Sequence, residues 1–189
     1  MADLILASAS PRRKELLQQI GVNIAIRPVD IDETVLANES AKDYVVRLAR
    51  EKAEACHEQE RPVLGSDTCV VVDDEILGKP QSKEAAIAML TRLSGRSHEV
   101  FSGVAIRQGT RLDVRYVATR VTFKTLTAAQ IEAYVATEEP MDKAGSYGIQ
   151  GMGAVLVERI HGSFSNVVGL PLETVAAMLD SFSVPYWQT

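Results

Sequence analysis

Short strand-like runs alternate with helical segments along this chain, and that alternation restricts its fold more than any other feature. Leu4–Ser8 is a short apolar run typical of a buried strand. Ser10 then serves as a helix N-cap, with Pro11 in the first helical turn. Further helices are expected at about 40–57, 82–93, from 127 onward, and 171–182. Strands between these helices predict an α/β fold with a mixed sheet.

Turn signals divide the middle of the chain. Asp73-Asp74 predicts a hairpin turn within residues 68–77, and Gln108-Gly109-Thr110 predicts a second hairpin between two β-rich runs. Asp67 is expected at the end of a buried strand over 62–66. Residues 138–153 contain four glycines and a proline, so they are expected to form a loop. A last strand is expected over 154–160.

Composition sets the class of protein. The chain has 189 residues, the usual size of one domain, and we expect residues 1–189 to form one. Its formal net charge of −5 argues against broad binding to nucleic acid or to an anionic membrane. Cys56 and Cys69 form no CxxC pair and are expected to be buried thiols. With no signal peptide or membrane span expected, we predict a cytoplasmic protein.

The first helix carries arginines where its dipole disfavours them. Arg12 and Arg13 lie in the first turn, and Arg13 falls on the same side as the apolar Leu16 and Leu17. Free N–H groups, serine hydroxyls and two guanidiniums meet at this terminus, which is a favourable anion site. A single arginine there would simply be solvated, but the complete Ser8–Arg13 pattern favours phosphate binding.

Three other charged residues break the apolar pattern. Lys52 falls within the apolar stripe of the 40–57 helix, where it either extends to solvent or meets an anion. Asp67 follows a buried strand, where a carboxylate is paired, bound to metal, or satisfied by turn N–H groups. Lys79 lies on a stiff Gly-Lys-Pro turn and would ordinarily be solvated. Each signal is weak alone.

The glycine-rich stretch Gly145–Gly151 would let backbone approach a ligand closely. It lacks the G-x-G-x-x-G dinucleotide fingerprint, and the chain has no G-x-x-x-x-G-K-[ST] motif. The sequence therefore predicts neither a Rossmann enzyme nor a P-loop enzyme.

Together these stretches resemble the Maf family of nucleoside triphosphate pyrophosphatases. The matching segments are SASPRR, Asp32-Glu33, ARLAREKA-like residues 47–53, Gly65–Thr68, Gly78–Pro80, DKAG at 142–145 and YGIQG at 147–151. They occur in the family's order over nearly the whole chain. The resemblance implies an elongated mixed sheet flanked by helices, with two lobes around a central cleft.

The resemblance also implies an activity. Family members hydrolyse a nucleoside triphosphate to the monophosphate and pyrophosphate with a divalent cation, Mg²⁺ or Mn²⁺. Arg12, Thr68 and Gln150 resemble the dTTP/UTP pyrophosphatase subgroup rather than the one acting on 7-methyl-GTP. The family is also associated with inhibition of septum formation. A homodimer is plausible from the family, with no nucleic acid or membrane partner.

These features give a hypothesis in which water attacks the α-phosphorus and positioning and charge neutralisation dominate. Arg13, Lys52 and Lys79 would neutralise the triphosphate, and Ser8 and Ser10 would add donors. Asp67 would act as general base or hold the metal, and Glu33 would make a second metal or water contact. The sequence does not separate base from ligand.

The expected base pocket has its own logic. Gln150 both donates and accepts, whereas Arg12 only donates, which suits the carbonyl groups of uracil or thymine. Cytosine presents an amino donor to that arginine, so we expect it to bind poorly. Thr68 would contact base or sugar.

Three alternatives stay open at this point. The nearest is the same chemistry on another nucleotide, such as a modified pyrimidine or 7-methyl-GTP. A second is a nucleotide-binding regulator of cell division without turnover, although a bare carboxylate at Asp67 argues against it. A nucleic-acid-binding module ranks last, because aromatic residues make up 5% of the chain and the net charge is negative.

Overall fold

The structure is a computed structural model that describes residues 2–188. Internal contacts divide the described chain into two compact units. Unit 1 holds residues 2–68, 102–117 and 169–188, and unit 2 holds residues 69–101 and 118–168. The chain passes between the units four times, so neither unit is continuous in sequence.

Seven strands form one mixed sheet, in the order β2-β1-β3-β5-β6-β7, with β4 paired to β3. Their bounds are β1 Leu4–Leu6, β2 Ile24–Ile26, β3 Val63–Val72, β4 Glu75–Leu77, β5 Ser97–Gln108, β6 Arg111–Phe123 and β7 Val157–His161. β1 runs parallel to β2 and β3, whereas β4 and β7 run antiparallel to their partners. The predicted mixed α/β sheet is therefore confirmed.

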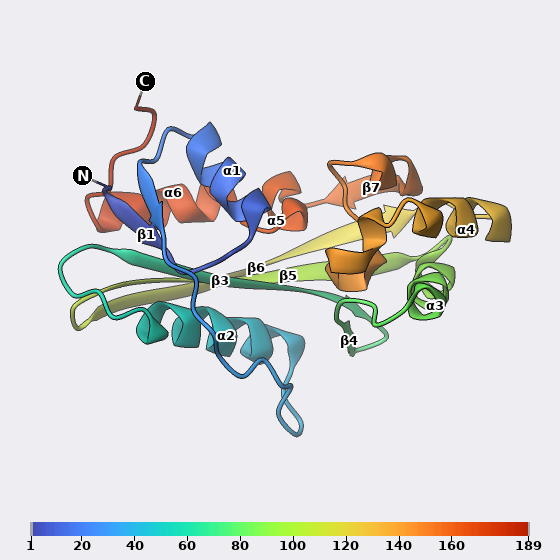
Figure 1. The fold of residues 1–189 in the computed structure, drawn as a ribbon, viewed down its shortest axis with the longest axis horizontal. Helices are drawn as coiled ribbons and strands as arrows, with labels where there is room; N and C mark the ends of the chain where they lie inside the picture. Colours follow the sequence, from blue (N-terminus) through green and yellow to red (C-terminus); the bar gives the residue numbers. More distant parts are fainter. Residues whose placement is uncertain (1, 189) are drawn as a thin grey trace. The chain divides into compact units, whose positions relative to one another are not determined.

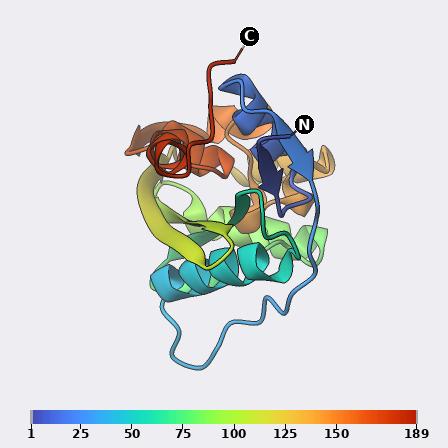
Figure 2. The same ribbon diagram turned by 90° about the vertical axis from the view of Figure 1, so that its left-hand side faces the viewer.

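Helices cover both faces of the sheet in unit 1. The helices are α1 (Pro11–Gln19), α2 (Ala41–Ala55) and α6 (Leu172–Ser181). α2 lies on one face, and α1 and α6 lie on the other (Figures 1 and 2). The apolar β1 is buried completely between these layers, together with Leu17 and Leu48 from the helices. This is the expected arrangement for a strand that is apolar on both faces.

Two glycines allow α2 to approach the sheet very closely. A Cβ atom added at Gly65 of β3 would lie 2.3 Å from the Ala49 carbonyl oxygen of α2. One added at Gly103 of β5 would lie 2.1 Å from the Val45 carbonyl oxygen. The absence of side chains at these positions brings the backbone of α2 against β3, which places Lys52 beside that strand.

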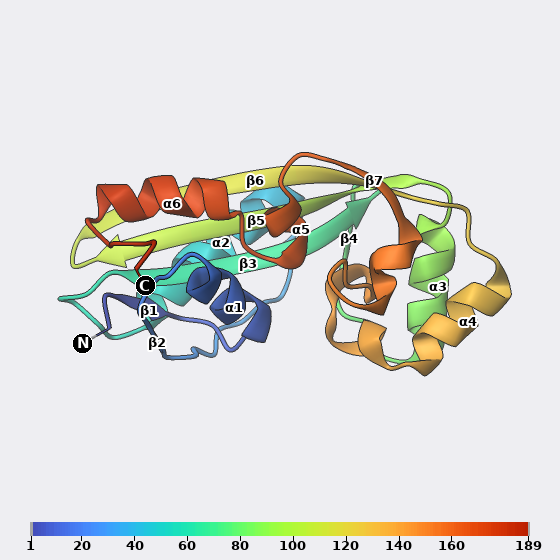
Figure 3. The ribbon, with the colours of Figure 1, turned by 90° about the horizontal axis from the view of Figure 1, so that it is seen from above.

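Unit 2 has its own apolar core, to which Val72, Leu90, Phe123 and Tyr147 contribute. It contains α3 (Lys83–Leu93), α4 (Ala128–Ala136) and the short α5 (Phe164–Val168). α3 and α4 pack side by side (Figures 1 and 3). Over residues 2–188, none of the helices is long and apolar enough to cross a membrane.

Local signals placed most of the elements correctly. Ser10, Ser40, Ser82 and Thr127 each cap a helix, and Thr127 forms the predicted capping box with Gln130. Asp73 and Asp74 both have positive φ at the predicted β3–β4 turn. Both cysteines are buried and free.

Several predictions need correction. Asp67 lies in the middle of β3 rather than at the end of a strand, because β3 continues to Val72 by pairing with β4. The predicted loop at 138–153 contains 3-10 turns at Glu139–Asp142 and Ala144–Ser146, and a third begins at Met152. Because that third turn extends to Leu156, β7 begins at Val157 rather than at the predicted residue 154. The short helix α5 was not predicted.

The glycine contacts generate a stability prediction. Gly65→Ala forces backbone apart at the α2–β3 contact, so we expect a loss of about 1–3 kcal/mol in the free energy of unfolding, measured by urea titration. Gly78→Ala is the matched control, because a Cβ there meets no atom within 4 Å. Equal stability of the two variants would contradict the close-packing argument.

Candidate active site

The connection between β1 and α1 is shaped by two serine hydroxyls. The Ser8 Oγ accepts a hydrogen bond from the Ser10 backbone N–H at 3.2 Å. The Ser10 Oγ caps α1 by accepting from the Arg13 backbone N–H at 3.4 Å. Both oxygens serve here as acceptors, so each hydroxyl hydrogen remains available to donate to a ligand.

The Arg13 guanidinium is buried among neutral acceptors. Its Nε donates to the Gly169 carbonyl at 3.0 Å, its Nη1 to Ser8 Oγ at 3.2 Å and its Nη2 to Thr68 Oγ1 at 3.1 Å. Burial lowers the pKa of Arg13, and the nearby Asp67 carboxylate partly offsets that effect. Because its hydrogen-bond partners are neutral, the charge of the guanidinium remains able to attract an anion.

Thr68 positions this arginine. Its Oγ1 lies 2.8 Å from Ser102 Oγ and donates to the Gly169 carbonyl at 3.2 Å, in addition to accepting from Arg13. These partners occupy the hydroxyl, so the threonine methyl is the part left for a ligand. The predicted contact of Thr68 with base or sugar stays a prediction.

Lys52 bridges two carboxylates. Its Nζ lies 2.8 Å from Asp67 Oδ1 and 2.7 Å from Glu33 Oε1. The side chains of Lys52 and Asp67 are each 11% exposed, whereas that of Glu33 is 55% exposed. The lysine in the apolar stripe therefore meets two anions instead of extending to solvent, and it joins the acidic loop to β3.

The loop that carries Glu33 is held by α2. Arg47 donates to the Thr34 carbonyl at 3.0 Å and forms a bidentate ion pair with Glu39 at 2.6 and 2.8 Å. The Tyr44 hydroxyl donates to the Glu33 carbonyl at 3.1 Å. Hydrogen bonds to Glu39 raise the pKa of Arg47. These contacts fix the loop backbone without using the Glu33 carboxylate.

Strand pairing explains why polar residues lie in the middle of β3. β1 pairs with β3 at Val63 and Leu64, and β4 pairs with it at Val70–Val72. Asp67 and Thr68 lie between these two pairings. The edge of β3 between its two partner strands leaves room for polar side chains and a ligand. From the sequence alone, such a position is expected at the end of a strand.

Unit 1 thus brings together most of the predicted site. The cluster, which we call the serine–arginine site, comprises Ser8, Ser10, Arg13, Glu33, Lys52, Asp67 and Thr68. Arg12 lies half-buried in the first turn of α1. Lys79 and Gln150 belong to unit 2, where both are exposed.

The loop that carries Gln150 is clamped inside unit 2 by Glu139. Its carboxylate accepts from the Met152 N–H at 2.8 Å, the Gly153 N–H at 2.9 Å and the Tyr134 hydroxyl at 2.8 Å. Burial acts to raise the pKa of Glu139, but the Gly153, Met152 and Tyr134 hydrogen bonds and the Lys143 charge together bring the pKa below its ordinary value. The clamp therefore closes around a charged carboxylate.

Glycines make the clamp possible. A Cβ at Gly151 would lie 2.3 Å from Glu139 Oε2, and one at Gly153 would lie 2.5 Å from the Tyr134 hydroxyl. Gly151, which ends the stretch predicted to let backbone approach a ligand, and Gly153 beyond it let this loop fold tightly onto Glu139 and Tyr134.

The donor set of the serine–arginine site suits a hard cation. Among the described residues, no group of three or more His, Cys, Asp or Glu side chains is placed to hold a metal ion. Mg²⁺ is usually bound by one or two carboxylates together with waters and substrate phosphates. Glu33 and Asp67, which both contact the Lys52 ammonium, would supply the two carboxylates of such a site.

Sequence reasoning missed several residues of the site. Ser102, fully buried within the apolar β5, was detectable as a polar break in that strand. The Gly169 carbonyl, from a glycine with φ of 134°, gave no signal because any residue has a carbonyl. Arg47 and Glu139 resemble ordinary surface charges in sequence.

The clamp yields a prediction. Glu139→Gln places an amide NH₂ group against backbone N–H donors, so we expect about tenfold faster amide exchange at Met152 and Gly153, equivalent to losing a charged hydrogen bond. Hydrogen exchange followed by NMR measures it. Glu132→Gln, an exposed glutamate on α4, is the matched control. Unchanged exchange in Glu139→Gln would contradict the clamp.

Solved structures support the fold. A HAM1 protein from Coxiella burnetii aligns with a TM-score of 0.53 at 16% identity, covering 96% of this chain and 100% of that one. The Staphylococcus aureus Ham1 protein aligns with a TM-score of 0.51 at 14% identity, covering 94% of this chain and 98% of that one. At such identities the likeness concerns the fold.

Sequence comparisons are more specific. A protein of Alcanivorax borkumensis named dTTP/UTP pyrophosphatase is 53% identical over 189 residues, covering 98% of both chains. One of Moorella thermoacetica with the same name is 50% identical, covering 99% of this chain and 98% of its own. The family model described as Maf-like protein matches residues 3–182. The chain therefore belongs to the Maf-like protein family.

Proposed function

We infer that this protein is a nucleoside triphosphate pyrophosphatase that hydrolyses dTTP and UTP to the monophosphate and pyrophosphate. Full-length relatives at about half identity carry that name. One observation carries the inference. The neighbouring residues Asp67 and Thr68 of β3 contact Lys52 and Arg13 respectively, so a buried ion pair lies next to an anion site. The reaction is hydrolysis of an acid anhydride.

Phosphate binding follows from the geometry of Arg13. Three neutral acceptors hold its guanidinium, so little reorganisation is needed when a triphosphate arrives. The Ser8 and Ser10 hydroxyl hydrogens and the N-terminus of α1 add donors. Lys79 is proposed to neutralise further charge on the triphosphate.

Asp67 is proposed to take the proton of the attacking water. Lys52 holds one carboxylate oxygen, Oδ1, which orients the group and directs the other oxygen elsewhere. The water then attacks the α-phosphorus while pyrophosphate leaves, and the oxygen–phosphorus bond to pyrophosphate breaks. Positioning and neutralisation contribute most of the acceleration in such reactions.

A divalent cation, Mg²⁺ or Mn²⁺, is proposed as cofactor, held by Glu33 and Asp67 with substrate phosphates. When bound, it would neutralise charge on the triphosphate and on the leaving pyrophosphate. The Glu33 loop is fixed by Arg47 and Tyr44, so its carboxylate would turn from Lys52 to a metal without rebuilding of the loop.

Pyrimidine selectivity is proposed to involve Arg12 and Gln150. Gln150 can pair with both a donor and an acceptor of uracil or thymine, and the Glu139 clamp holds its loop. A mispaired amino group on cytosine costs about 1–3 kcal/mol, or about tenfold to a hundredfold in specificity. Cytoplasmic location, homodimer formation and a septum-related role remain predictions.

Removal of the Asp67 carboxylate tests the chemistry. Asp67→Asn keeps an oxygen for Lys52 but loses the base, so we expect turnover of UTP to fall about 10²–10⁴-fold. Pyrophosphate release from dTTP, UTP, CTP and 7-methyl-GTP with Mg²⁺ or Mn²⁺ is the measurement. Asp113→Asn, which removes a half-buried carboxylate of β6 that pairs with Arg115, is the control. Near-normal Asp67→Asn turnover, or equal rates on CTP and UTP, would overturn the corresponding assignment.

The metal assignment has a separate test. Glu33→Gln removes one charged oxygen ligand, so we expect the Mg²⁺ concentration for half-maximal rate to rise about tenfold while the saturated rate changes less. Asp30→Asn, an exposed carboxylate of the same loop, should leave that concentration unchanged. If both variants raise the Mg²⁺ concentration for half-maximal rate equally, the effect comes from the overall charge of the loop, and the metal assignment of Glu33 is wrong.

A further inference from the structure

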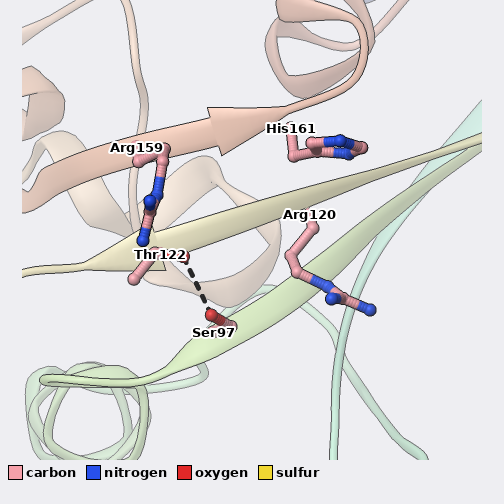
Figure 4. A pocket seen from close by; sticks show the side chains of 5 residues that line it. All are labelled: Ser97, Arg120, Thr122, Arg159 and His161. Carbon is pink, nitrogen blue, oxygen red and sulfur yellow. Dashed lines mark hydrogen bonds between the residues drawn. The ribbon is translucent and has the colours of Figure 1, made fainter.

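Unit 2 contains a basic pocket that the proposed catalysis does not use. Ser97 of β5, Arg120 and Thr122 of β6, and Arg159 and His161 of β7 line a hollow of about 330 Å³. All five residues belong to unit 2 (Figure 4). The hollow lies on the polar face of the strands, because Val121 and Phe123, which alternate with the lining residues of β6, are buried in the core.

Strand register brings the lining residues together. Arg120 lies opposite His161, and Thr122 lies opposite Arg159. The Ser97 and Thr122 hydroxyls hydrogen-bond to each other at 2.8 Å. In Figure 4 the Arg159 guanidinium extends toward Thr122, while His161 and Arg120 lie at the neighbouring pair of positions. The pocket thus combines an arginine with two hydroxyls and, one pair along, an arginine with a histidine.

The charges of the pocket are poorly compensated. Arg120 meets one carboxylate, that of Glu99, at 3.8 Å. Among the described residues, the Arg159 side chain takes part in no hydrogen bond or ion pair, although its backbone belongs to the β6–β7 pairing. The Arg120 guanidinium lies opposite the His161 imidazole, so this cross-strand pair contains no carboxylate that would offset the arginine charge. In a chain with net charge −5, such a cluster is better explained by a bound anion than by nonspecific attraction to polyanions.

The spacing suits a ligand with two phosphate groups. The two cross-strand pairs are two residues apart along β6, roughly 6.8 Å. Long arginine side chains span that separation, and guanidiniums bind phosphate oxygens in bidentate fashion. The Ser97 and Thr122 hydroxyls share one hydrogen bond, which leaves one hydroxyl hydrogen of the pair to donate to a phosphate oxygen.

We propose that this pocket is a second, noncatalytic binding site for a small diphosphate-bearing anion. The site goes beyond the proposed activity, because its residues take no part in the serine–arginine site and binding requires no turnover. The shared chemistry has two possible sources, inorganic pyrophosphate and the phosphates of a nucleotide.

Histidine NMR offers a local test. The chain has three histidines, and His161 is the one that lines the pocket. His57 is exposed in unit 1, and burial lowers the pKa of His98 to about 4, so both serve as internal references at neutral pH. Pyrophosphate titrated at constant ionic strength should shift the His161 ring signals saturably. UDP and UMP titrations distinguish the sources: preference for UDP over pyrophosphate indicates a nucleotide, and the reverse indicates the inorganic anion.

Matched variants make the test specific. Arg120→Gln/Arg159→Gln should raise the pyrophosphate concentration at the midpoint of the His161 response at least about tenfold, as expected for lost charged hydrogen bonds. Lys42→Gln/Arg115→Gln removes the same charge from exposed positions of unit 1 and should leave the midpoint unchanged. An absent or nonsaturating response, equal weakening in both variants, or an equal response to chloride would overturn the proposal. Because binding is measured without hydrolysis, these outcomes do not depend on the proposed catalytic function.

Discussion

The ammonium of Lys52 is the contact on which the serine–arginine site depends. It holds Asp67 of β3 and Glu33 of the acidic loop at once, so two carboxylates distant in sequence contact the same ammonium group. A buried carboxylate without a partner is costly, and removing one member of such a pair leaves the other uncompensated. Lys52 reaches this position because Gly65 and Gly103 admit the backbone of α2 to the sheet. Backbone packing therefore determines the electrostatics of the site.

Arg13 illustrates the opposite arrangement, since its guanidinium is held by hydroxyl and carbonyl oxygens rather than by a carboxylate. An ion pair would satisfy the charge and compete with an incoming anion, whereas neutral acceptors fix the geometry and leave the charge available. Lys52 and Arg13 divide the work accordingly. Lys52 organises the carboxylates, and Arg13 is prepared for phosphate.

Local chemistry made much of the fold predictable, because caps and tight turns depend on few neighbouring residues. Ser10, Thr127 and Asp73-Asp74 were placed correctly for that reason. Asp67 was placed at a strand end because a carboxylate usually interrupts an apolar strand. The tertiary pairing of β3 with β4 overrides that preference, and Lys52 supplies the missing partner.

The site was predictable where a residue contradicted its local pattern. Arg13 and Lys52 stood out because charged side chains fell on apolar helix faces. Ser102, Gly169 and Arg47 did not, because their contributions depend on contacts between distant segments. A carbonyl oxygen or an exposed-looking arginine acquires its role only when the fold places it.

The two loops that carry predicted functional side chains are anchored by different residues from those expected to meet the substrate. Arg47 holds the backbone around Glu33, and Glu139 holds the backbone beyond Gln150. Each anchor is a charged side chain bonded to backbone groups, so its geometry does not depend on the identity of the functional side chain. Changing Glu33 or Gln150 should therefore alter ligand contacts with little effect on the loop, whereas changing an anchor displaces the whole loop. Substrate preference can then diverge within this fold through a few exposed positions while the anchors stay in place.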